Sequence, residues 1–192
     1  MSASARFAGA LRSRGLALFA EVVWVGLLVA LCSLPVVTAL PAAAAGGARL
    51  RRHIAGEDDA LNGFVRDLGS ALRRGWLAGA IAAGVGFALV VNTTAPMMAA
   101  VPGGEALRLV SIAAAVVLGT VALRVAAMWR PSARWRVLLR AAAARTASDL
   151  RGTAMLVLAI VLATTIVWMF APLVVLAPGL LLFAAVAVSP KP

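Results

Sequence analysis

Residues that could carry out catalysis or hold a metal are few in this chain of 192 residues. It contains seven acidic residues, one histidine and one cysteine. The histidine, His53, follows two arginines, and no second histidine or cysteine stands at zinc-ligand spacing. No nucleophile is paired with a base in a catalytic motif, and no phosphate-binding glycine loop occurs. We therefore predict that the protein is not an enzyme and has no metal or cofactor.

The run Glu57-Asp58-Asp59 resembles a calcium-binding loop only in composition. A calcium loop spaces its oxygen ligands apart and turns at a glycine, and this run does neither. Acidic residues are favourable in the first turn of a helix, where they face the positive end of the helix dipole. The run therefore predicts the start of a helix.

Glu21 is the acid with the greatest potential for function, because it interrupts an apolar stretch. An acid at membrane depth is costly, so it is usually paired or functional. If the chain turns back near residue 36, Glu21 lies level with residue 51. We therefore predict an ion pair that locks two helices together, with Arg49, Arg51 or Arg52 as the partner. A proton or substrate site at Glu21 is the alternative.

The composition indicates that much of the molecular surface faces a medium other than water. Apolar residues make up 63% of the chain and the mean hydropathy is +1.00, whereas soluble domains are about 45–50% apolar. The charged residues are clustered, and the apolar stretches between them are long enough for a bilayer, which takes about 20 helical residues. We predict an all-α fold, a polytopic transmembrane helical bundle that forms a single domain over residues 1–192.

Two prolines, Pro35 and Pro41, divide the first apolar run. One straight helix from residue 16 to residue 48 would measure about 50 Å, which exceeds a hydrocarbon core of about 30 Å. Proline removes a backbone donor and clashes with the preceding turn, so the helix breaks there. The sequence predicts a helical hairpin with spans at about 16–33 and 40–54, whose second helix packs closely through small residues.

A cleaved signal peptide is the alternative interpretation of this segment. A basic start, an apolar core and the stretch Pro41-Ala42-Ala43-Ala44-Ala45 match its layout. Glu21 interrupts the apolar core, however, and arginines would follow the cleavage site almost at once, where positive charge impedes export. We expect the segment to be retained.

Two basic amphipathic helices on the cytoplasmic side are predicted between the apolar runs, at about 58–74 and 131–151. In the first, apolar residues recur at helical spacing opposite charged ones. The apolar residues are Leu61, Phe64, Val65, Leu68 and Leu72, and the charged ones are Arg66, Asp67, Arg73 and Arg74. Trp76 then stands where an aromatic residue of the membrane interface is expected.

Four further spans are predicted, which brings the total to six. They cover about 76–98, 106–129, 153–170 and 173–189. A turn at Pro96 and Pro102 joins the third span to the fourth, and the last two spans form a second tight hairpin around Pro172 and Pro178. Arg124, inside the fourth span, is expected to extend its side chain to the headgroups.

The positions of the basic residues predict which side of the membrane each segment faces, because such residues stay on the cytoplasmic side. With six spans and both termini in the cytoplasm, 17 of the 18 basic residues are inside and only Arg108 is outside. A five-span arrangement, which leaves Arg6, Arg12, Arg14 and Arg108 outside, is the alternative. Abundant alanine and arginine indicate a GC-rich bacterial genome, so we predict a multi-pass protein of a bacterial cell membrane.

The net charge of +11 has a simpler explanation than a nucleic acid partner. The arginines lie between apolar spans, and retention near anionic cytoplasmic headgroups accounts for them. The predicted partner is therefore the lipid bilayer with its anionic cytoplasmic headgroups, and we expect no binding to nucleic acid.

A set of residues within about the first 70–80 positions carries a resemblance to a known family. The set comprises Trp24, Leu34-Pro35-Val36-Val37-Thr38, Pro41-Ala42, Arg51-Arg52-His53, Gly56-Glu57 and Phe64. The Leu-Pro-Val-Val-Thr block followed by Pro-Ala is fairly specific, because an apolar span rarely ends in this way. In these residues the chain resembles the YesL family of bacterial integral membrane proteins. It departs from the family pattern at Glu21, where an asparagine commonly stands three residues before the tryptophan.

The resemblance implies an integral membrane protein without an assigned activity. Genes of this family often lie near carbohydrate uptake systems of the ABC type, which implies an accessory role in sugar import and an ABC-type sugar permease as partner. A small secondary transporter with its site near the broken first hairpin is the alternative, and it requires a polar cavity near the bilayer midplane.

Overall fold

The computed structural model describes residues 3–57, 61–94 and 103–189. Within these ranges every regular element is an α-helix or a short 3-10 helix, so the predicted all-α class is confirmed. The elements in chain order are α1 (Ala3–Cys32), the 3-10 helix η1 (Val36–Thr38), α2 (Ala39–Ile54), α3 (Leu61–Thr94), α4 (Gly104–Met128), α5 (Trp135–Ser148), α6 (Leu150–Met169), the 3-10 helix η3 (Ala171–Val175) and α7 (Ala177–Val188). The predicted turn at Pro96 and Pro102 lies outside the described residues, as do Asp58 and Asp59.

Within the described ranges, four helices are long and apolar enough to cross a membrane. They are α1 over Gly15–Cys32, α3, α4 and α6, and only 11–28% of the residues in their most apolar stretches are buried inside the protein. Large apolar side chains such as Phe87 and Trp168 therefore point outward, 71% and 88% exposed. Apolar surface of this extent is compatible with a membrane location.

Two of the predicted spans, 40–54 and 173–189, correspond to helices outside this group of four. The first of these helices, α2, has 16 residues, and the second, α7, has 12. At about 1.5 Å per residue, neither reaches across a hydrocarbon core of about 30 Å on its own.

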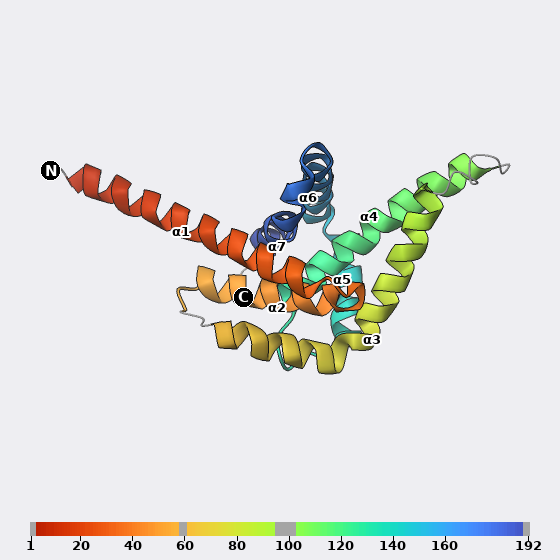
Figure 1. Ribbon diagram of the computed structural model, residues 1–192, viewed down its shortest axis with the longest axis horizontal. Coiled ribbons are helices and arrows are strands. Elements are labelled where there is room, and N and C mark those ends of the chain that lie inside the picture. The colour runs from red at the N-terminus through yellow and green to blue at the C-terminus, as the bar shows by residue number, and fades with distance from the viewer. Residues whose placement is uncertain (1–2, 58–60, 95–102, 190–192) are drawn as a thin grey trace.

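The predicted boundary between a surface helix at 58–74 and a span at 76–98 is wrong. A single helix, α3, runs from Leu61 to Thr94, because no proline interrupts the segment and removes a backbone donor. Figure 1 shows that α3 changes direction along its length, so that its first part lies beside α2 and its second part runs alongside α4. The second surface helix is shorter than predicted and covers Trp135–Ser148.

The turn expected near Pro35–Thr38 is present and joins α1 to α2. The hydroxyl of Thr38 donates hydrogen bonds to the carbonyls of Cys32 and, at 2.6 Å, of Pro35, which closes the turn on both sides. From there α2 runs through the middle of the molecule, between α1 and the first part of α3, and also packs against α4 and α7 (Figure 1).

Small side chains allow α2 to occupy this central position. The segment 42–48 consists only of alanine and glycine, and ten residues of α2 are buried. A Cβ atom on Gly47 would lie far inside van der Waals contact with the backbone carbonyl of Ala126 in α4. The two helix backbones therefore approach as closely as in small-residue contacts between transmembrane helices.

Candidate functional site: buried charges and an apolar hollow

Glu21 of α1 forms an ion pair with Arg49 of α2. The Nε atom of Arg49 donates to Oε1 of Glu21 at 2.6 Å, and the two side chains are 9% and 15% exposed. The antiparallel course of α1 and α2 brings residues 28 positions apart to the same level. The second nitrogen of the guanidinium, Nη1, is buried without a partner among the described residues. Both charges are thus removed from solvent, which makes each dependent on the other.

Arg51 does not contact Glu21 but binds the end of α4. Its guanidinium donates to the backbone carbonyls of Ala126, at 3.3 Å, and of Ala127 and Trp129. The last carbonyls of a helix have no partner within the helix and carry the negative end of its dipole. Arg51 therefore supplies both hydrogen bonds and a favourable charge, and joins α2 to α4.

Arg52, the third candidate partner of Glu21, pairs with Asp67 of α3. The distance from Nη2 of Arg52 to Oδ2 of Asp67 is 2.7 Å, and the Asp67 side chain is 4% exposed. The prediction that Asp67 lies on the outer face of its helix is therefore wrong. The inner face carries small residues, Phe64 and Asp67, whereas Val65 is 59% exposed.

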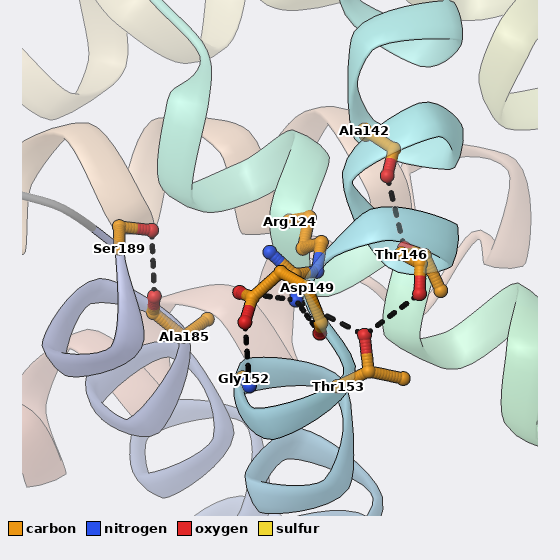
Figure 2. Close-up of polar contacts among 8 residues, drawn as sticks. All are labelled: Arg124, Ala142, Thr146, Asp149, Gly152, Thr153, Ala185 and Ser189. Carbon is orange, nitrogen blue, oxygen red and sulfur yellow. Dashed lines mark hydrogen bonds and ion pairs between the residues drawn. The ribbon is translucent and has the colours of Figure 1, made fainter.

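Arg124 of α4 is buried with a polar cluster at the start of α6 (Figure 2). Its Nη2 atom donates to Oδ2 of Asp149 at 3.0 Å and to the hydroxyl of Thr153 at 3.1 Å. That hydroxyl in turn donates to the carbonyl of Thr146. The expectation that Arg124 reaches the headgroups is wrong, because its side chain is only 5% exposed.

Asp149 has two roles in this cluster. Its Oδ1 atom accepts a hydrogen bond from the backbone N–H of Gly152 at 2.8 Å, which caps the N-terminus of α6. This N–H and the guanidinium of Arg124 hold the pKa of the Asp149 carboxyl below its ordinary value. The cap and the ion pair together attach α6 to α4.

These contacts join four chain segments to one another. The segments are the C-terminal end of α2, the first part of α3, the C-terminal end of α4 and the start of α6. Sequence reasoning missed Asp67 and Asp149 as partners. The small number of acids in the sequence could have indicated these partners. Each buried arginine needs a carboxylate or an equivalent set of backbone carbonyls, and few carboxylates are available.

A hollow of about 620 Å³ lies between the start of α2, the second part of α3 and α4, with α6 and α7 at its rim. Its lining consists of alanine, glycine and larger apolar side chains, including Val36, Leu40, Phe87, Leu118 and Ile160. Such a surface offers van der Waals contact to an apolar chain and no side-chain hydrogen bond to a polar molecule.

The residues that carry the family resemblance form the first turn and its packing. Leu34, Pro35, Val36 and Val37 are exposed at the turn, and Trp24 is 40% exposed on α1. The buried members are Pro41 and Ala42 at the start of α2 and Phe64 on α3. The aromatic ring of Phe64 packs in a cluster with Leu50 and Ala126. These residues shape the hairpin and bring no group together that could react.

Among the described residues, no three His, Cys, Asp or Glu side chains gather as a metal site would require. Comparison of the chain with protein-family models, with curated proteins and with solved structures finds no match.

Proposed function

We propose that this chain is a non-catalytic, multi-pass membrane protein related to the YesL family, which acts as an accessory subunit of an ABC-type carbohydrate uptake system. The observation that supports a non-catalytic role is the use of the buried charges. Glu21, Arg49, Arg52, Asp67 and Arg124 engage in ion pairs that join helices. Each of these charges has a protein partner that compensates its burial, so a substrate is not needed to explain it.

The proposal includes a topology in which both termini and the basic segments joined by the ion pairs face the cytoplasm. The pairs bind the ends of α2 and α4 to the starts of α3 and α6, so these basic segments share one side. That arrangement satisfies the positive-inside rule. In a six-span topology, α2 and α7 would be short return helices that complete two hairpins against α1 and α6.

Reporter fusions at residues 60, 103 and 192 test this topology. We expect the reporters at 60 and 192 to report a cytoplasmic position and the one at 103 an external position. An external signal at residue 60 would contradict the topology, since it would place the arginine-rich segment outside the cell.

The accessory role itself rests on the resemblance, and co-purification tests it. A tagged chain extracted in mild detergent should retain a sugar permease at constant stoichiometry, whereas a tagged multi-pass protein of unrelated function should not. Isolation of the chain alone from several detergents would contradict the role.

A small secondary transporter with its site near the broken first hairpin is the second candidate. The observation in its favour is that the hollow adjoins that hairpin through Val36, Ala39, Leu40 and Ala43. Its apolar lining argues against a sugar, which would lose hydrogen bonds there without replacement. Uptake of labelled sugar into proteoliposomes at the rate of empty vesicles would exclude sugar transport by the isolated chain.

A further inference from the structure

A second pocket, of about 410 Å³, lies on the first part of α3 and is separate from the ion pairs described above. It is lined by Arg66, Gly69, Ser70, Arg73 and Arg74, with Pro131 from the connection between α4 and α5. The side chains of all three arginines are exposed to the surroundings. The pocket is therefore open and built mainly from one helix face, which carries three arginines whose stems form much of its wall.

The arginines stand on that face because of their spacing. Residues 66, 70 and 73 lie one or two helical turns from one another and Arg74 adjoins Arg73, which places all four within one broad face of α3. Like charges gathered on one face repel one another. The ion pairs among the described residues engage Arg49, Arg52 and Arg124, and none of them relieves this repulsion with a carboxylate at Arg66 or Arg73.

The third arginine is fixed by the opposite wall. Nη1 of Arg74 donates to the carbonyl of Pro131 at 3.2 Å, which orients the guanidinium across the pocket. Gly69 forms an open floor, since a Cβ atom there would meet nothing within 4 Å. The result is a concave site with three guanidinium groups and room for a tetrahedral anion. Guanidinium groups bind phosphate oxygens in pairs, which gives such a site directional strength.

The position of the pocket on α3 indicates the source of the anion. Trp76 follows Arg74 by two residues and is 59% exposed, and beyond it α3 continues as an apolar helix with exposed Leu77 and Ile81. This order of arginines, aromatic residue and apolar helix is typical of the cytoplasmic membrane interface, where lipid phosphates lie.

We propose that the pocket formed by Arg66, Arg73 and Arg74 binds the phosphate of an anionic lipid headgroup. The proposal rests on the membrane location and cytoplasmic orientation stated above, and it is independent of any role in sugar uptake. Basic pockets beside transmembrane helices on this side of a membrane bind such headgroups.

Native mass spectrometry of the full chain, released from nanodiscs, tests the proposal. The nanodiscs contain equal amounts of phosphatidylglycerol and phosphatidylcholine, and the measured quantity is the ratio of the two bound lipids. We expect a preference for phosphatidylglycerol that falls about tenfold or more in the double variant Arg66→Gln/Arg73→Gln. The matched control is Arg136→Gln/Arg140→Gln, which removes the same charge from exposed positions of α5 outside the pocket. An equal loss in both double variants would overturn the proposal, because a general basic surface would then explain the preference.

A substitution at the pocket floor gives a second test without removal of an arginine. In Gly69→Glu the new carboxylate stands three residues after Arg66 and four before Arg73, where it can pair with both. We expect Gly69→Glu to abolish the preference and the isosteric Gly69→Gln to retain at least half of it. Retention of the full preference in Gly69→Glu would contradict the site.

Competition with inorganic phosphate distinguishes a pocket that binds only the phosphate of a lipid headgroup from one that also binds the free ion. If millimolar phosphate displaces phosphatidylglycerol from the pocket but not from the control positions Arg136 and Arg140, the pocket binds phosphate both as a free ion and as part of a lipid. If phosphate has no effect while the two variant pairs behave as expected, the pocket requires the lipid. If the reporter fusions place residue 60 outside, the topology fails but the pocket is still tested. The nanodisc experiment exposes both faces of the bilayer, so its result does not depend on the orientation of the chain.

Discussion

The first hairpin, α1 with α2, and the last, α6 with α7, are built on the same proline spacing but are held in place differently. Pro35 and Pro41 are six residues apart, as are Pro172 and Pro178, and a 3-10 helix forms each turn. In the first hairpin, α2 has ten buried residues and its arginines reach three other helices. In the last, α6 and α7 have three buried residues each, and the one ion pair found among the described residues lies at the base of α6.

In both hairpins the prolines set where the chain turns, and the small and charged residues set how deeply the helices are buried. Leucine and valine are equally compatible with lipid and with the protein interior, so they favour neither. Alanine, glycine and paired charges gain more from a protein neighbour than from lipid. The helix richest in them, α2, lies at the centre, whereas α6 of the last hairpin projects away from the other helices (Figure 1).

The largest effect is expected from Gly47→Val in the first hairpin. The new side chain would collide with the backbone of α4 at Ala126, and neither helix can move without separating α2 from its neighbours. We expect a loss of at least about 3 kcal/mol, enough to prevent recovery of a monodisperse protein on fluorescence-detected size exclusion. Gly84→Val is the matched control, since a Cβ atom at Gly84 meets nothing within 4 Å. A normal profile for Gly47→Val would refute the central position of α2.

The next largest effect is expected when the ion pair of the first hairpin is broken. Glu21→Leu leaves the buried guanidinium of Arg49 without its partner, which costs about 3–5 kcal/mol. The double variant Glu21→Leu/Arg49→Leu removes both charges and should recover most of that loss. Thermal unfolding in detergent measures both. Equal stability of Glu21→Leu and the native chain, or unchanged folding and membrane level in Glu21→Gln, would mean that the pair does not lock the hairpin.

A smaller effect is expected from Arg51→Met, which keeps the apolar stem and removes the guanidinium. The carbonyls of Ala126, Ala127 and Trp129 then lose a charged donor, at a cost of about 2 kcal/mol. Hydrogen exchange should increase at the C-terminal end of α4 and remain unchanged in α6. Uniform exchange across both helices would indicate that Arg51 does not act as a local cap.

The smallest effect is expected at Asp149, the one charged anchor of the last hairpin. Because its pKa is lowered in the folded protein, its charged form stabilises the fold above the ordinary carboxyl value of about 3.9. That contribution is lost as the pH falls below this value and through the lowered pKa. Asp149→Asn should therefore lower the unfolding temperature near pH 7, where the charged form contributes fully, and flatten the dependence of that temperature on pH below about 5. An identical acid profile in the variant would exclude this role.

Much of the fold could be predicted from the sequence because its signals are local. The apolar runs, the prolines at the first turn and the position of Glu21 opposite the arginines at 49–52 all follow from spacing along one chain. The sequence offers three arginines as partners of Glu21, and the structure shows that Arg49 forms the ion pair. Choice among the three depends on the rotation of α2 about its axis, which all four of its helical neighbours determine.

The sequence predictions are wrong where they assign the buried side of a helix from its apolar residues alone. On α3, Val65 and Leu61 are exposed while Asp67 is buried, because the face with small residues fits against α2 and Arg52 needs an acid there. On α4, Arg124 was expected to reach outward, yet a carboxylate 25 residues later in the chain binds it inside. A contact across that separation leaves no periodic signal in the sequence.

The amino-acid sequence alone predicts that this protein is helical, where its chain breaks and that its surface is apolar enough to be compatible with a membrane location. The packed structure adds which arginine meets which acid, which helix occupies the centre and that three arginines of α3 line an open pocket. The physical reason is that apolar side chains are satisfied equally by lipid and by protein. Burial in such a chain is therefore selected by close backbone approach and by charge pairing between distant segments, which exist only once the helices have packed.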